Sequence, residues 1–300
     1  MSVRHHVSDR GGIVQKDGVA GRMKKIAAIC VGLTLVILLG PCLYLLLASF
    51  MSPQEVALYY GTEGSASLHF WPDIFSLDGY YEVLLRRPDY LVKFWNSLLF
   101  AGGIALGQAI LSSLEGFALA CLRLPGRKAI LFCCVLMMLM PMQVSLISTY
   151  ALLDALSLLG TRIGLALSVL FTPFGAFLMT LCLKRVPSNI FEAAALDGAG
   201  PLRLFWNIGL PCAAPGFCTV LVLGFLDIWN MVEQPLLFLQ HPSQYPLSLF
   251  LASNLEQNLP LCFVCGVLAL APALLLYLFF QDELVGGLRE VHRTGGNYGT

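Results

Sequence analysis

The sequence has little charge. Only 12% of its 300 residues are Asp, Glu, Lys or Arg, and 57% are apolar, whereas soluble domains carry about 25% charged residues. The mean hydropathy is +0.77. This composition excludes an ordinary soluble domain and predicts an integral membrane protein in contact with lipid. The formal net charge is zero, so the charge balance does not indicate a nucleic-acid partner.

The sequence also lacks the short motifs of nucleotide-binding and hydrolytic enzymes. It contains no G-x-x-x-x-G-K-[ST] phosphate loop, no G-x-G-x-x-G turn and no G-x-S-x-G elbow. We therefore expect no catalytic residue and no bound cofactor in this chain. If ATP drives its activity, the hydrolysing site must be on another polypeptide.

Metal and redox chemistry have little support in the sequence. The ten cysteines lie in or beside apolar runs, where they are expected to act as small apolar side chains. Cys262-x-x-Cys265 has the spacing of a zinc or redox pair, but no second pair and no nearby histidine accompany it. The five histidines are scattered through terminal and external segments: His5, His6, His69, His241 and His292. The sequence therefore predicts no metal site.

Six apolar runs are long enough to cross a bilayer, which requires about 20 helical residues. They are Ile26 to Phe50, Phe94 to Leu122, Ala129 to Leu153, Ile163 to Leu183, Leu210 to Met231 and Leu259 to Gln281. The sequence thus predicts an all-helical, multi-pass membrane protein with six transmembrane helices. The first run could also be a secretory signal, but its 25 uncharged residues are too many for the core of such a signal.

The basic residues indicate the orientation, because loops rich in Lys and Arg stay on the cytoplasmic side. With the N-terminus inside, 14 of the 18 Lys and Arg residues face the cytoplasm. The other four, which face outward, are Arg86, Arg87, Lys93 and Arg162. Both termini are then cytoplasmic, and so is the polar break around Glu192.

These spans divide the chain into successive segments. The predicted segments are a cytoplasmic N-terminal segment (1–25), a first transmembrane helix (26–50), an external loop (51–93), a five-helix core (94–281) and a cytoplasmic tail (282–300). The core contains a polar break at residues 184–209, called the Glu192 loop below.

The Glu192 loop has the local signals of a helix, a tight turn and a second helix. Asn189, with Glu192 three positions later, is a capping pattern for a short Ala-rich helix. Gly198 is suited to end that helix in a left-handed conformation. Pro201 suits the first turn of the next helix, which continues to Ile208. Both helices are rich in apolar residues on the water side of the membrane, so we expect a protein partner to cover them.

The loop also carries a recognisable spacing of residues. Glu192-Ala193-Ala194, followed by Asp197-Gly198 and then Ile208-x-Leu210-Pro211, resembles the EAA loop of binding-protein-dependent ABC importer permeases. Further pieces, in order over residues 79–288, resemble the permeases of maltose-type carbohydrate importers: Asn96-Ser97-Leu98, Leu124-Pro125-Gly126-Arg127-Lys128, Pro141-x-Gln143-Val144 with Tyr150, Trp229-Asn230, Pro235-Leu236 and Tyr245-x-Leu247.

This resemblance implies a fold, partners and residue roles. It implies a type I ABC importer permease in the bacterial cytoplasmic membrane, paired with a second permease chain and supplied by an external solute-binding protein. ATP and Mg would be bound by separate ATPase subunits. Glu192 would anchor the loop, Ala193 and Ala194 would permit close docking, and Gly198 would make the turn. The tail departs from the family pattern, since Gly287-Leu288 is followed by a charged stretch up to Arg293.

A small set of residues inside the spans stands out as candidates for a substrate path. Glu115 and Asp227 are carboxylates in apolar runs, where an ionisable group is costly and usually faces a cavity or a partner. Trp229 and Asn230, close to Asp227, could offer a sugar a stacking face and hydrogen bonds. A structural role remains open for all four residues. The two carboxylates also keep an ion-coupled carrier or channel open as the alternative function, whereas a lipid-acting enzyme lacks the convergent groups that it would need.

Two spans contain signals of interruption. Pro141 and Gln143 lie in the third run, and Pro173 and Gly175 lie in the fourth. Such residues break helical hydrogen bonding or allow helices to approach closely. Whether they act as hinges or in packing stays open at this point.

Overall fold

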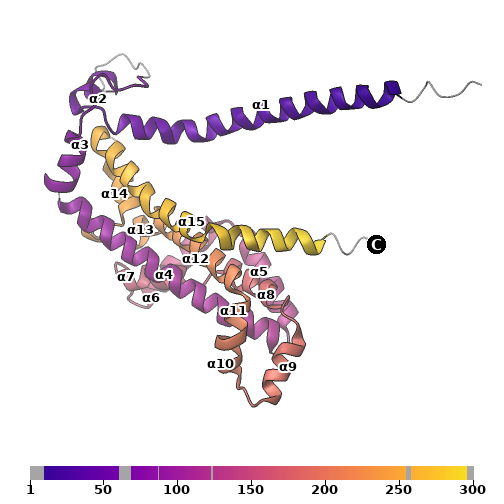
Figure 1. Cartoon of the computed structure of the whole chain (residues 1–300). Coiled ribbons are helices and arrows are strands. Elements are labelled where there is room, and N and C mark those ends of the chain that lie inside the picture. Colours follow the sequence, from indigo (N-terminus) through magenta and orange to yellow (C-terminus); the bar gives the residue numbers. More distant parts are fainter. Residues whose placement is uncertain (1–9, 61–68, 87, 123, 255–257, 296–300) are drawn as a thin grey trace, which may run out of the picture. The chain divides into compact units, whose positions relative to one another are not determined.

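The computed structural model describes residues 10–60, 69–86, 88–122, 124–254 and 258–295. All the secondary structure within these ranges is helical (Figure 1), which confirms the predicted all-helical class. The chain divides into two compact units, Met1–Tyr80 and Tyr81–Thr300. They are called unit 1 and unit 2 below, and each is described by itself.

Unit 1 consists of a long helix followed by short ones. Helix α1 runs from Arg10 to Ala48, and α2 from Pro53 to Tyr60. The short α3 (Asp78–Tyr81) begins at the end of the unit. The stretch Ala27–Ala48 has a mean hydropathy of 2.5, so lipid is its natural surrounding.

Unit 2 is a bundle of helices, several of which are short. Its elements up to the Glu192 loop are η1 (Glu82–Arg86), α4 (Pro88–Cys121), α5 (Arg127–Leu139), α6 (Met142–Ala155), α7 (Arg162–Leu170) and α8 (Pro173–Leu183). The remaining elements are α9 (Ser188–Leu196), α10 (Pro201–Leu204), η2 (Phe205–Gly209), α11 (Leu210–Cys212), α12 (Ala214–Trp229), α13 (Glu233–Phe238), η3 (Pro242–Gln244), α14 (Leu247–Asn254) and α15 (Leu259–Gly295).

The six predicted apolar runs coincide with three long helices and three bent helix pairs. The long spans are Ala27–Ala48, Asp89–Cys121 and Leu259–Glu283. The pairs are α5 with α6, bent by 104°, α7 with α8, bent by 41°, and Pro201–Cys212 with α12, bent by 79°. By length and composition the described residues therefore hold three spans, or up to six if each bent pair is one span.

Proline explains where two of these pairs break. Pro141 precedes the first residue of α6, and Pro173 is the first residue of α8. Proline has no backbone N–H and its ring clashes with the carbonyl four residues before it, so a helix stops there. The interruptions predicted at Pro141 and Pro173 are confirmed.

The centre of unit 2 is a close seam between α4 and α8. A β-carbon added at Gly116 would lie 2.5 Å from Cβ of Met179, and one added at Gly175 would overlap Oγ of Ser112. Small residues at such contacts let helix backbones approach closely in a membrane protein. The predicted close approach at Gly175 is confirmed. Helix α12 packs on the same central helix α4 and also on α15.

Two separate pieces of the sequence resemblance meet in this unit. Ser97 is buried, and its Oγ accepts a hydrogen bond of 2.7 Å from the backbone N–H of Leu247 at the start of α14. Nearby along α4, the hydroxyl of Tyr90 donates to the carbonyl of Cys265 at 3.3 Å. These bonds connect α4 to the last two helices of the chain.

Helix α15 is longer than the predicted sixth span. It continues from Leu259 to Gly295, so the predicted tail from residue 282 is helical up to Gly295. Cys262 and Cys265 are both buried in this helix, in keeping with the predicted role of cysteine as a small apolar side chain.

Candidate functional site

The Glu192 loop forms a helical hairpin at one end of unit 2 (Figure 1). Helix α9 forms its first arm, and α10, η2 and α11 form its second arm. The predicted order of helix, turn and helix is confirmed. The second helix differs from the prediction, because only Pro201–Leu204 is α-helical and Phe205–Gly209 is a π-helix.

The predicted capping pattern at Asn189 is wrong. Helix α9 already begins at Ser188, and Pro187 precedes it with φ −57° and ψ 132° and no side-chain capping bond. Proline fixes this extended entry through its ring, so Asn189 lies inside the helix. Glu192 is exposed and forms no ion pair or hydrogen bond with another residue in the described ranges. Its carboxylate is thus available to a partner.

Gly198 makes the turn of the hairpin, as predicted. Its φ is +82°, in the left-handed region. The N–H of Ala199 donates to the carbonyl of Ala194 at 3.0 Å, and the N–H of Gly198 donates to the carbonyl of Ala195 at 3.0 Å. This crossed pair of bonds is the Schellman motif, which satisfies the last carbonyls of a helix.

Pro211 explains the π-helix that comes just before it in the second arm of the hairpin. The N–H of Leu210 donates to the carbonyl of Phe205, five residues earlier. Because Pro211 has no N–H to continue the ordinary ladder, the helix widens before it. Gly209 lies at this point against the ring of Phe117, since a β-carbon there would be 3.1 Å from Cδ2 of that ring. The motif Ile208-x-Leu210-Pro211 therefore lies where the loop turns into α12.

Three phenylalanines attach the Glu192 loop to the bundle. The ring of Phe117 on α4 lies 6.0 Å from that of Phe191 on α9 and 5.5 Å from that of Phe205 on η2, both edge to face. Phe205 is only 2% exposed and belongs to the same buried cluster as Phe117 and Leu183. Sequence reasoning did not single out these rings. The only available signal was a large aromatic residue in each arm of a loop made mostly of small or polar residues.

The outer side of the hairpin is apolar and uncovered. Neither α9 nor α10 contains a buried residue. Four large apolar side chains are exposed on the two arms: Ile190 (43%), Leu196 (89%), Leu202 (70%) and Trp206 (52%). Exposed apolar groups of this kind, on a turn that also carries charged side chains, are typical of a protein interface.

A cavity of about 300 Å³ lies between α4, the start of α8 and α12. Its lining residues are Gln108, Thr172, Phe174, Val220, Leu223, Gly224 and Asp227. The walls combine apolar side chains with the amide of Gln108, the hydroxyl of Thr172 and the carboxylate of Asp227. This mixture is typical of small-molecule sites.

Gln108 is the most buried polar side chain of this cavity. It is 4% exposed, and its Nε2 donates to the carbonyl of Val169 at 2.6 Å. Its Oε1 is buried and has no hydrogen-bond partner in the described part of the chain. A β-carbon at Gly224 would overlap this oxygen, so a larger residue there would displace the amide of Gln108. Sequence reasoning missed Gln108, whose signal is a lone amide within an apolar run.

The residues predicted for a substrate path do not all converge. Asp227 lines the cavity. Trp229 instead stacks on Phe225 at 5.6 Å, and its Nε1 donates to the carbonyl of Ala269 on α15 at 3.2 Å. Asn230 donates to the carbonyl of Leu226 at 2.8 Å at the end of α12. Trp229 and Asn230 therefore serve helix packing and helix ending.

Glu115 is separate from the cavity. It is half-buried on α4, and its Oε2 has no hydrogen-bond partner within the ranges that the structure describes. It is not among the residues that line the cavity around Asp227. The two carboxylates that stand out in the sequence thus do not form one site.

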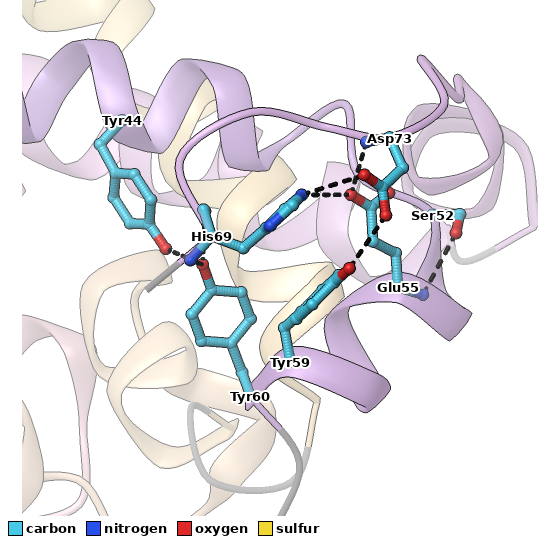
Figure 2. A network of polar contacts seen from close by, with 7 residues as sticks. All are labelled: Tyr44, Ser52, Glu55, Tyr59, Tyr60, His69 and Asp73. Atoms are coloured by element: carbon cyan, nitrogen blue, oxygen red, sulfur yellow. Dashed lines mark hydrogen bonds and ion pairs between the residues drawn. The ribbon is translucent and has the colours of Figure 1, made fainter. Parts of the chain in front are cut away.

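One of the five histidines lies beside two carboxylates, a grouping that the sequence did not indicate. His69 in unit 1 lies beside Glu55 and Asp73, with its Nε2 3.6 Å from Oε1 of Glu55 and 3.3 Å from Oδ1 of Asp73 (Figure 2). Glu55 lies on α2, and the other two residues lie in the described stretch that begins at His69 and precedes α3.

Comparison with known proteins identifies the family of this chain. A family model, the binding-protein-dependent transport system inner membrane component, matches residues 96–290. The chain belongs to this family. The matched range contains both the Glu192 loop and the cavity around Asp227. The predicted resemblance to ABC importer permeases of the carbohydrate type is confirmed.

Individual relatives agree with this family membership. The arabinooligosaccharides transport system permease protein AraQ of Halalkalibacterium halodurans is 26% identical over 251 residues, which cover 83% of this chain and 88% of the relative. The sn-glycerol-3-phosphate transport system permease protein UgpE of Brucella abortus is 24% identical over 272 residues, covering 87% and 94%. A solved bacterial ABC transporter involved in the import of the acidic polysaccharide alginate has a chain that matches with a TM-score of 0.74 at 19% identity, covering 93% of this chain and all of that one. This solved transporter chain therefore has the same fold as the present chain.

Proposed function

We propose that this chain forms half of a sugar-conducting pore and receives its driving motion through the Glu192 loop. In this account the exposed apolar side of α9 and α10 is the docking surface for an ATPase subunit. The observation that carries the proposal is the uncovered hairpin itself, with Leu196 89% and Leu202 70% exposed. A partner that covers these side chains gains roughly 25 cal/mol for each Å² of apolar surface removed from water.

The three phenylalanines then transmit the motion of the hairpin. Phe117 on α4 contacts both Phe191 and Phe205. A displacement of either arm of the hairpin therefore pushes on α4. Interiors are close-packed, so they transmit such displacements instead of absorbing them. Helix α12 continues from the second arm and carries Asp227 at the cavity. Movement of the hairpin would therefore alter the walls of the cavity.

The cavity suits a solute with several hydroxyl groups. Oε1 of Gln108, the hydroxyl of Thr172 and the carboxylate of Asp227 are hydrogen-bonding groups of the kind that sugar hydroxyls satisfy. The names of AraQ, of UgpE and of the alginate transporter describe an oligosaccharide, a polyol phosphate and a polysaccharide. A carbohydrate or a related polyhydroxylated solute is the substrate class that these observations support.

The proposed assembly contains further chains. Two cytoplasmic ATPase subunits would bind ATP and Mg, a second related permease would complete the pore, and an external binding protein would deliver the solute. The family name supports the binding protein. This account includes six spans, which requires that each bent pair is one crossing of the membrane. It also places both termini in the cytoplasm of a bacterial cell, as the distribution of Lys and Arg indicates.

The ion-coupled carrier gains no support from the cavity. Such a carrier relays ions between ionisable groups inside the membrane. Glu115 does not line the cavity that holds Asp227, so the two carboxylates offer no common ion site.

The test is uptake by the complete transporter in proteoliposomes with the substitution Leu196→Glu. Docking would bury the new carboxylate without a partner charge, which is unfavourable. We therefore expect uptake to fall at least tenfold and the ATPase subunits to be lost on purification. Leu77→Glu is the matched control, because Leu77 is 66% exposed in unit 1. Full uptake by Leu196→Glu would contradict the docking role.

A further inference from the structure

Three side chains of the kinds that bind metals meet in unit 1, at a place that the transport account does not use. Glu55 comes from α2, and His69 and Asp73 come from the segment between α2 and α3 (Figure 2). One ligand atom from each residue lies within 4.8 Å of the other two. Figure 2 shows the imidazole edge pointing at both carboxylates.

Two of these three side chains are shielded from solvent, whereas that of Asp73 is 58% exposed. The side chain of Glu55 is only 6% exposed, and that of His69 is 26% exposed. Nε2 of His69 is buried and has no hydrogen-bond partner among the described residues, although carboxylate oxygens lie 3.3 and 3.6 Å away. A buried carboxylate requires a compensating charge. The nitrogen that faces it makes no hydrogen bond that would use its lone pair.

Other groups hold each ligand in place. The ring of Tyr59 stacks on that of His69 at 4.1 Å and 2°, and its hydroxyl donates to Oδ2 of Asp73 at 3.1 Å. The backbone N–H of Asp73 donates to Oε1 of Glu55 at 2.8 Å. Such outer contacts orient the ligands of metal sites.

The backbone of His69 is fixed as well. The hydroxyl of Tyr60 donates to the carbonyl of His69 at 2.7 Å and accepts from its N–H at 3.1 Å. Tyr44 on α1 donates to the same hydroxyl at 2.6 Å. The main chain of His69 is thus bonded to Tyr60 on α2, which Tyr44 on α1 holds in turn, and its ring is stacked on Tyr59, as Figure 2 shows.

We propose that Glu55, His69 and Asp73 bind one divalent transition-metal cation, of which zinc is the type. Imidazole and carboxylate are both zinc ligands, and sites with three protein ligands keep a further position open. Ligand atoms at about 2.0–2.1 Å from a tetrahedral ion lie roughly 3.3–3.4 Å from one another. The distances of 3.3 and 3.6 Å from Nε2 of His69 match that separation. Calcium and magnesium prefer six or more oxygen ligands, so the imidazole favours zinc.

A bound cation would have a structural effect within unit 1. It would balance the charge of two carboxylates, one of them buried, and it would join α2 to the segment that begins at His69. The open coordination position would accept water or a side chain of a binding partner. This site does not depend on the proposed docking of an ATPase.

The test is zinc binding by the complete chain in nanodiscs, without a polyhistidine tag. After removal of metal with a chelator, zinc is titrated and the bound metal is measured by mass spectrometry. We expect one high-affinity zinc per chain and at least a 100-fold loss of affinity in His69→Ala. Tyr59→Phe removes only the hydrogen bond to Asp73, so we expect about a tenfold loss. Asp78→Asn is the matched control, because this carboxylate of unit 1 bonds to Ser76, and it should bind zinc like the unaltered chain.

X-ray absorption at the zinc edge distinguishes zinc bound at this site from zinc bound by the thiols or by the other imidazoles of the chain. We expect scattering from a single imidazole and from oxygen ligands in the unaltered chain, and none from imidazole in His69→Ala. Absence of high-affinity zinc in the unaltered chain would overturn the proposal. Zinc held by sulfur, or held equally well by His69→Ala, would overturn it as well.

Discussion

Gly198 is the residue on which the shape of the Glu192 loop depends most directly. Its φ of +82° belongs to the left-handed region, where a side chain adds about 1–2 kcal/mol of strain. A β-carbon there would meet no atom within 4 Å, so the backbone alone sets the penalty. This separates a conformational requirement from a packing requirement.

Substitutions at Gly198 should therefore rank by backbone preference. We expect Gly198→Asn to retain most uptake, Gly198→Ala to lose several-fold, and Gly198→Pro to abolish it, because proline cannot adopt this φ and removes the N–H that bonds to Ala195. Membrane insertion should be unchanged in all three, measured by the amount of chain in the membrane fraction. Gly200→Ala is the control, since its φ is −70° and its surroundings are open. Normal uptake by Gly198→Pro would contradict this role.

Asp227 and Glu115 provide a second comparison between single residues. Asp227 lines the cavity and Glu115 does not. A hydrogen bond to a charged group contributes about 1.5–3 kcal/mol, so Asp227→Asn should raise the solute concentration for half-maximal uptake about tenfold or more. Glu115→Gln should leave that concentration unchanged. Uptake is measured in proteoliposomes with the binding protein present. An effect of Glu115→Gln together with no effect of Asp227→Asn would show that the solute does not pass through the cavity.

Among the helices, the Glu192 loop shows which features local sequence predicts. Its order of helix, turn and helix follows from Gly198 and Pro201, whose preferences act on their own backbone. The π-helix at Phe205–Gly209 could not be predicted, because it depends on Pro211 together with the close contact between Gly209 and Phe117. The helix start at Ser188 was misplaced because Pro187 outweighs Asn189 as an entry signal.

The attachment of the hairpin to the bundle leads to a prediction about coupling. Phe205→Ala removes a ring that is 2% exposed and contacts Phe117, and such changes destabilise locally by about 3–5 kcal/mol. We expect ATP hydrolysis to continue while transport falls, so that fewer solute molecules enter for each ATP hydrolysed. Phe132→Ala is the control, because Phe132 on α5 is 62% exposed. A variant that keeps the normal ratio of transport to hydrolysis would show that Phe205 does not transmit the motion.

For the whole molecule, composition predicted an all-helical membrane chain, and residues far apart in sequence account for what it did not predict. The bends at Pro141 and Pro173 follow from local chemistry. The cavity needed Gln108 to meet Gly224 from another helix, and the cluster around His69 needed Glu55 on α2 to meet Asp73. Such meetings depend on tertiary packing, which periodicity and spacing do not encode.

The most direct measurement of the central claim is photo-crosslinking from position 196 in the assembled transporter. A photoreactive amino acid replaces Leu196, and the adducts are identified by mass spectrometry, with the same group at Leu77 as the control. The account predicts an adduct between position 196 and a subunit that carries a phosphate-binding loop, and none with that subunit from position 77. Such an adduct would also place the Glu192 loop in the cytoplasm, as the distribution of Lys and Arg predicts. Adducts from position 196 with lipid alone, in a preparation that hydrolyses ATP and transports solute, would contradict the account.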